Sequence, residues 1–298
     1  MATQSLNGVS TITEGRTEQR AGRVPPHLYF LVSAVFHYLG PAFAVLLFAR
    51  VDVLGVAWLR IASAGVVFAL WKRPWRSFRE LSVRDRRTVC ALGVVLASMN
   101  VCFYLAISRL PLGTVGAIEF LGPIGLAAAS VRSLRNSAAL VFAMGGVYLL
   151  TNLRLSGEPL GYVFAFANCA LFVLYIVLGH RIARGGGPAG IERLAAAMLI
   201  ALVAVSPIGV KGALRALFEP RLLLAGIGVG ICSSVIPYIC DQFAMARLSK
   251  ATFATLLSLL PATACVIGVL VLRQIPSHSE MIGIGSVIVG VALRRSES

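Results

Sequence analysis

An apolar segment from Pro111 to Ser130 carries one carboxylate, Glu119, and a proline four residues further on, Pro123. A second isolated charge, Arg60, lies in an apolar segment of its own. An unpaired charge in the middle of a bilayer costs at least about 2.5–3.5 kcal/mol, so each charge needs a partner or water. We expect either that Arg60 and Glu119 form an ion pair that joins two helices, or that Glu119 faces a polar cavity and holds a substrate ammonium group or a proton.

Two pairs of polar residues repeat at one spacing. Asn100 and Tyr104 are four residues apart, and so are Tyr238 and Gln242, so each pair shares one face of a helix. Amides donate and accept hydrogen bonds, while tyrosines combine an apolar ring with a hydroxyl. We predict that these four residues and Glu119 line one polar pathway.

For three other groups of polar or reactive residues, a structural role is favoured. Asp241 is expected near a helix end, where anchoring a loop is the favoured role and a substrate contact is the alternative. His37 is expected to join two helices by a hydrogen bond rather than to relay protons. The six cysteines show no spacing typical of a zinc site or a disulfide framework, so neither a metal nor a cofactor is predicted.

The composition requires lipid as the main solvent of these elements. Of 298 residues, 58% are hydrophobic and 13% are charged, and mean hydropathy is +0.85. Soluble proteins carry about twice that charged share. We predict an all-α polytopic membrane protein with ten transmembrane helices, because ten continuously apolar runs lie mostly near the length that spans a bilayer. The runs are 28–49, 55–71, 88–108, 114–131, 137–152, 160–179, 191–210, 222–244, 252–272 and 280–293.

The lysines and arginines predict the orientation. With the N-terminus in the cytoplasm, the cytoplasmic segments hold 19 of them and the opposite segments hold 7. This bias favours both termini in the cytoplasm. The net charge of +15 then faces anionic lipid head groups, and no nucleic-acid partner is expected. Residues 1–27 are polar and are predicted to be a disordered cytoplasmic tail without a signal peptide.

The sequence also contains an internal repeat. A shift of 138 residues lays 102–123 over 240–261 with seven of 22 positions identical, among them an Arg-Leu pair and the final prolines, Pro123 and Pro261. Each half holds five runs, and an odd number inverts the second half, as in many secondary transporters. The prolines are expected near the middle of the fourth and ninth helices, either lining a central cavity or only kinking the helices. The predicted units are two inverted five-helix repeats, 28–152 and 160–294.

The segment ASMNVCFYLAISRLPLGTVGAIEFLGPIGLA, residues 97–127, resembles the first-half signature of EamA-type carriers in the drug/metabolite transporter superfamily. The closest resemblance is to the branch of bacterial threonine/homoserine exporters, and segments 55–76 and 233–262 are similar to it too. The residues fairly specific to that branch are Asn100, Tyr104, Pro111, Gly113, Glu119, Phe120, Gly122 and Pro123. The resemblance covers 28–293 and implies an inner-membrane carrier with a central pathway that exports small polar metabolites such as these amino acids.

Two positions depart from the family pattern. Leu260 stands where the exporters carry a glutamate before the second-half proline, and Arg273-Gln274 stands where they tend to carry Gly-Glu. The missing acid leaves the substrate and the coupling ion open. A drug or natural-product efflux carrier of the same fold is therefore the alternative.

Other classes of function lack their motifs. The sequence has no catalytic pattern of an intramembrane enzyme, no selectivity filter of a channel and no nucleotide-binding loop. We therefore predict gradient-driven transport and no enzymatic activity. The expected partners are a small-molecule substrate and the lipid bilayer, with the protein a monomer or a homodimer.

Overall fold

The computed structural model describes residues 25–122, 125, 134–152, 158–184, 187–248, 253, 256 and 259–293. All regular structure within these residues is helical. The elements are α2 (Pro26–Leu47), α3 (Val53–Lys72), α4 (Pro74–Glu80), α5 (Val83–Ile107), α6 (Leu112–Glu119), α8 (Leu134–Asn152), α9 (Pro159–Ala183), α10 (Gly187–Phe218), α11 (Pro220–Gly230), the π-helical segment η1 (Ile231–Val235), α12 (Ile236–Arg247), α14 (Leu259–Leu272) and α15 (His278–Leu293). Pro123 and most of the predicted tail lie outside the described residues.

Among the described residues, six helices are long and apolar enough to cross a membrane. The sixth is continuous from α11 through η1 to α12. These six are Pro26–Leu47, Val53–Lys72, Val83–Ile107, Pro159–Ala183, Ala189–Phe218 and Pro220–Arg247. The all-α class predicted from the apolar runs is therefore confirmed.

Several helix starts follow from local side-chain chemistry. Asp52 caps α3, because its Oδ1 accepts from the amides of Leu54 at 2.9 Å and Gly55 at 3.3 Å. Ser277 and Glu280 form a capping box at α15, in which Glu280 Oε2 accepts from the Ser277 amide at 2.8 Å. Both caps satisfy amides that a helix start leaves without partners.

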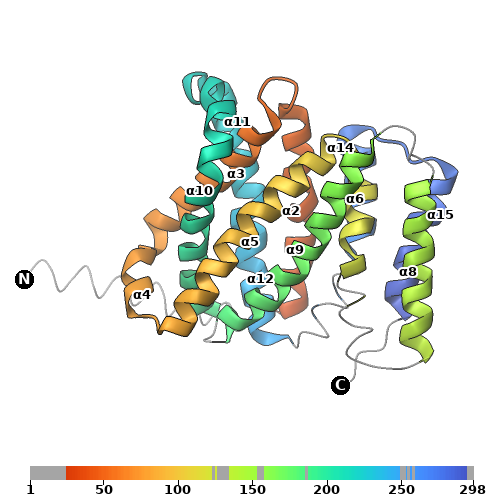
Figure 1. Ribbon diagram of the computed structural model, residues 1–298, viewed down its shortest axis with the longest axis horizontal. Coiled ribbons are helices and arrows are strands. Elements are labelled where there is room, and N and C mark those ends of the chain that lie inside the picture. Colours follow the sequence, from red (N-terminus) through yellow and green to blue (C-terminus); the bar gives the residue numbers. More distant parts are fainter. Residues whose placement is uncertain are drawn as a thin grey trace, which may run out of the picture.

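Figure 1 shows how the helices are grouped. Helices α8 and α15 pack mainly on each other along one edge, whereas α2 packs on α12 and α14 nearer the middle. Helix α10 packs on α3 and α5, and α5 packs on α9. The α2–α3, α5–α6, α10–α11 and α14–α15 connections lie together at the top of Figure 1, and α4 lies at the bottom.

Glycines allow the closest helix contacts. A Cβ added at Gly55 of α3 would lie 2.3 Å from the carbonyl carbon of Gly212 in α10. A Cβ added at Gly40 of α2 would lie 2.1 Å from Ser233 Oγ and 2.7 Å from the Ser233 amide. Small residues at such crossings are typical of membrane helices, where van der Waals packing drives association. The second crossing brings α2 directly against η1.

The structure differs from the predicted elements in three places. The segment between the second and third apolar runs contains a short helix, α4, which begins at Pro74, and proline is favoured in a first helical turn. The predicted tail ended at residue 27, but α2 already begins at Pro26. The eighth apolar run contains η1, and π-helical segments are frequent at functional sites.

Candidate functional site

Glu119 lies at the end of α6 and is 2% exposed. Its Oε2 accepts a hydrogen bond from the Tyr38 hydroxyl at 2.9 Å, and its Oε1 accepts from Asn168 Nδ2 at 2.8 Å. His37 Nε2 lies 3.8 Å from Oε2. Helices α2 and α9 therefore hold the carboxylate from two sides.

Arg60 of α3 is bound by η1. Its Nε donates to Ser234 Oγ at 2.8 Å, its Nη2 donates to the Ser233 carbonyl at 2.7 Å, and its guanidinium lies 5.4 Å from the centre of the Tyr104 ring. Hydroxyl and carbonyl dipoles and an aromatic face thus compensate the buried cation. Of the two alternatives drawn from the sequence, the direct ion pair between Arg60 and Glu119 is not formed here, because each group is held by other partners.

Arg60 and Glu119 nevertheless line one small cavity. Its volume is about 10 Å³, which is about the space of one water molecule. The lining residues are His37, Arg60, Met99, Asn100, Phe103, Glu119 and Asn168. A cationic group, an acidic group and two amides therefore converge on a point that is closed in this conformation.

Two amide oxygens at this cavity have no hydrogen-bond partner among the described residues. Asn100 donates through Nδ2 to the Leu96 carbonyl at 2.7 Å, and Asn168 donates to Glu119. The Oδ1 atoms of Asn100 and Asn168 are both buried and unpaired. Buried acceptors of this kind are costly unless a ligand or water supplies a donor.

The other predicted pathway residues are all buried, but they do not all lie at the cavity near Glu119. Tyr238 lies beside Asn100, and Tyr104 lies beside Arg60. Gln242 lies at the contact of α9 and α10, where a Cβ added at Gly190 would be 2.7 Å from its Oε1. Neither the Oε1 nor the Nε2 atom of Gln242 has a hydrogen-bond partner in the described part of the chain. Gln242 is absent from the lining of the cavity at Glu119.

Of the two prolines singled out in the sequence, Pro261 lies within the described residues. Pro261 is the third residue of α14 and is buried. Pro261 is not among the residues that line the cavity at Glu119, and both roles considered for it, lining a central cavity and kinking the helix, remain predictions. Pro123 falls outside the described residues.

Asp241 is more deeply placed in the helix bundle than its sequence position indicated. It is 4% exposed, its Oδ1 accepts from Ser33 Oγ at 2.5 Å and its Oδ2 accepts from the Tyr175 hydroxyl at 2.7 Å. The predicted loop-anchoring role is therefore wrong, because both oxygens are bound inside the helix bundle. Asn168 and Tyr175 were also missed, although their spacing of seven residues, two helical turns, places them on one face of α9.

A narrow crevice surrounds Asp241. Its lining comprises Phe30, Ser33, His37, Phe172, Tyr175, Asp241, Phe253 and Leu260. Leu260 is the position at which the resemblance calls for a glutamate. The crevice therefore holds a carboxylate despite that substitution, and Asp241 supplies it.

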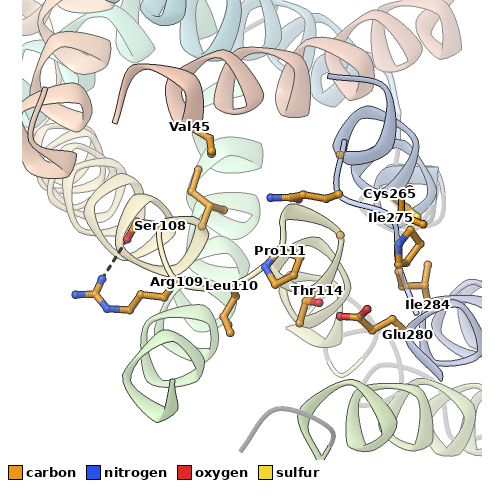
Figure 2. Close-up of a pocket in the computed structure, with 15 residues that line it drawn as sticks. Val45, Ser108, Arg109, Leu110, Pro111, Thr114, Cys265, Ile275, Glu280 and Ile284 are labelled. Atoms are coloured by element: carbon orange, nitrogen blue, oxygen red, sulfur yellow. Dashed lines mark hydrogen bonds between the residues drawn. The ribbon is translucent and has the colours of Figure 1, made fainter. Parts of the chain in front are cut away.

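A larger cavity of about 420 Å³ lies at the α5–α6 and α14–α15 connections (Figure 2). Figure 2 shows the Thr114 and Glu280 side chains pointing toward one another, while Arg109 points away from them and toward Ser108. Gln274, also in the lining, accepts a hydrogen bond from the Leu112 amide at 3.1 Å. We call this cavity the vestibule.

The second departure from the family pattern has a local explanation at the vestibule. Arg273 adopts φ 54, in the left-handed region that favours glycine, so the glycine expected from the resemblance fits this backbone better. Gln274 keeps a carbonyl-type acceptor for the Leu112 amide, as a glutamate would. The substitution at this position therefore preserves the link between α6 and the α14–α15 connection.

A close contact separates the vestibule from Glu119. A Cβ added at Gly116 of α6 would lie 2.7 Å from the Ala264 Cβ and 3.0 Å from the Tyr38 hydroxyl oxygen. Thr114 lies on the vestibule side of Gly116, and Glu119 lies on the other side along α6. Helix α6 therefore packs tightly against α14 and Tyr38 between the two cavities.

The fold and this site define a polytopic α-helical membrane protein whose polar groups converge between its helices. Residues 159–295 match the EamA-like transporter family. The threonine/homoserine exporter RhtA of Escherichia coli (strain K12) is 32% identical over 270 residues, which cover 88% of each chain. RhtA of Salmonella typhimurium (strain SL1344) is 31% identical over 269 residues, again 88% of each chain. The chain therefore belongs to the EamA-like transporter family.

A solved structure supports the fold separately. A crystal structure of a protein 20% identical in sequence aligns with 90% of this chain and 95% of its own, with a TM-score of 0.58. At that identity the likeness concerns the fold alone.

Proposed function

We propose that this protein is a secondary-active carrier of the bacterial inner membrane that exports small polar amino acids, with threonine, homoserine or close analogues as substrates. Two observations support the substrate class. The relatives from Escherichia coli and Salmonella typhimurium are threonine/homoserine exporters. The cavity at Glu119 also brings opposite charges together, which suits a zwitterion.

The convergence of Arg60, Glu119 and two unpaired amide oxygens carries the proposal. The substrate ammonium group binds the Glu119 carboxylate and the Oδ1 atoms of Asn100 and Asn168, which offers an acceptor for each of its donors. The substrate carboxylate binds the Arg60 guanidinium, which is charged at every physiological pH. Because the cavity now holds about one water, the helices must separate before a substrate enters.

We propose an architecture of ten transmembrane helices arranged as two inverted five-helix repeats. Each of the ten apolar runs overlaps a described helix, with α11, η1 and α12 sharing the eighth run. Helices α2 and α9 would be the first of each half, and both donate to the same two carboxylates. Both termini would face the cytoplasm, so the vestibule opens toward the periplasm.

Export of drugs or natural products is the alternative function of the same fold. Carriers of large apolar compounds need wide apolar pockets. The central cavity is lined by charged and amide groups rather than by an apolar wall, which favours a polar substrate.

The test uses substrate analogues that each lack one charge. Purified protein is reconstituted into lipid vesicles, and the vesicles are loaded with labelled threonine. Competition with threonine transport is then measured for homoserine, threonine methyl ester and 2,3-dihydroxybutyrate. We expect homoserine to compete, whereas the ester, which lacks the carboxylate charge, and the hydroxy acid, which lacks the ammonium group, do not. Equal competition by all three compounds would contradict a site that recognises both charges.

A further inference from the structure

Two buried carboxylates of this protein are held in the same way. One oxygen of each accepts from α2 and the other accepts from α9: Tyr38 and Asn168 serve Glu119, and Ser33 and Tyr175 serve Asp241. All four donors are neutral groups. Neither carboxylate has a salt bridge to an arginine or lysine in the described part of the chain.

His37 connects the surroundings of the two acids. It is 7% exposed and belongs to the lining of both the cavity at Glu119 and the crevice at Asp241. Its Nε2 lies 3.8 Å from Glu119 Oε2, and it shares the lining of the crevice with Asp241. Its ring lies 5.9 Å from that of Phe172, which stands between Asn168 and Tyr175 on α9.

The charged and titratable groups around His37 come from every side. Glu119 faces it from α6, Asp241 from α12, Arg60 from α3 and Tyr175 from α9. Arg60 is bound by η1, and α14 contributes the apolar Leu260. An imidazole ring can accept a proton at one nitrogen and donate one from the other, and here it lines a space with each of two acids whose hydrogen-bond donors are all neutral.

Although a helix-joining hydrogen bond is the role expected for His37 from the sequence, we propose that His37 passes the coupling proton between Glu119 and Asp241, so that Asp241 is the second proton site of the carrier. In one direction the O–H bond of the Glu119 carboxylic acid breaks as an N–H bond forms on His37. The imidazolium then gives up a proton to the Asp241 carboxylate, and His37 returns to its neutral state. One proton moves, and no other reactant is needed.

This step rests on the proposed function, which it supplies with a coupling mechanism. A substrate ammonium group binds Glu119 only when that carboxylate is ionised, so substrate and proton compete for one group. Moving the proton through His37 to Asp241 frees Glu119 for the next substrate. Proton entry from the periplasm would then drive export.

The first experiment compares His37→Gln with His27→Gln, a matched control because His27 is exposed on the same helix. Vesicles are assayed for threonine exchange without a proton gradient and for accumulation driven by a gradient. We expect His37→Gln and Asp241→Asn to lower driven accumulation by at least about tenfold more than they lower exchange. Equal losses in both assays, or no loss in either, would overturn the relay.

A second experiment does not depend on threonine being the substrate. The infrared bands of protonated carboxyl groups are followed during a pH titration and assigned with Glu119→Gln and Asp241→Asn. We expect His37→Gln to move the midpoints of both transitions by about one pH unit and His27→Gln to leave them in place. Unmoved midpoints would rule out the relay, whereas moved midpoints in a protein that transports no threonine would overturn only the proposed substrate.

Discussion

Glu119 and Arg60 show how one protein stabilises isolated charges without pairing them directly. Each takes neutral hydrogen-bond partners, and the two then meet only across a cavity with room for about one water. A direct ion pair would satisfy both charges permanently and leave nothing for a substrate. Separate partners hold the opposite charges in place for a zwitterion.

Glu119→Gln tests the acid at this site. The change keeps the size of the side chain and most of its hydrogen bonds but removes the charge that an ammonium group or a proton needs. We expect export of threonine to be lost while the amount of protein in the membrane stays near that of the wild type. Unchanged efflux from cells would leave Glu119 as a residue that only joins α6 to α2 and α9.

Arg60 is expected to couple energetically to Ser234 more than to Glu119. Hydrogen bonds to charged groups contribute about 1.5–3 kcal/mol, and the Arg60–Ser234 bond is one of these. In double-mutant cycles measured by unfolding in detergent, Arg60→Ala with Ser234→Ala should be clearly non-additive. A larger coupling between Arg60→Ala and Glu119→Gln would instead support the direct pair predicted from the sequence.

Element by element, the apolar runs located the helices because lipid requires about 20 apolar residues per crossing. The sequence also identified Arg60, Asn100, Tyr104, Glu119 and Tyr238 as buried polar residues, since such residues stand out in apolar segments. It could not identify the partners of Arg60, because the Ser233 carbonyl and the Ser234 hydroxyl belong to a segment more than 170 residues away in the sequence. It misjudged Asp241 because two donors from distant helices, Ser33 and Tyr175, hold that residue.

The crossing of α2 and η1 depends on Gly40. In Gly40→Ala the new methyl group would overlap Ser233, so α2 and η1 must separate, and overpacking of this kind typically costs about 1–3 kcal/mol. We expect a lower midpoint of thermal unfolding in detergent and weaker transport. Gly228→Ala in α11 is the matched control: a Cβ there meets nothing within 4 Å, and alanine is about 1 kcal/mol better than glycine in a helix. A Gly40→Ala protein as stable as the control would show that this crossing yields easily.

At the scale of the whole molecule, the open and closed regions together describe one state of a carrier. The vestibule is open, the cavity at Glu119 is nearly filled, and Gly116, Ala264 and Tyr38 separate the two. If substrate passes between Glu119 and the vestibule as proposed, we expect α6 to move away from α14 at this contact during alternating access. Because the Tyr38 hydroxyl binds Glu119, a change at that carboxylate acts directly on the closure.

Labelling of single cysteines tests the proposed orientation of the protein, which determines the side of the membrane to which the vestibule opens. In a background without the six native cysteines, Ser108→Cys places a thiol at the exposed vestibule rim, and Glu80→Cys places one at the exposed end of α4. If both termini are cytoplasmic, a membrane-impermeant maleimide added to intact cells should label position 108, and position 80 should react only after the membrane is permeabilised. The opposite pattern would invert the proposed topology. It would turn the vestibule toward the cytoplasm and make it the entrance for substrate, with the closed contact at Gly116 facing inward.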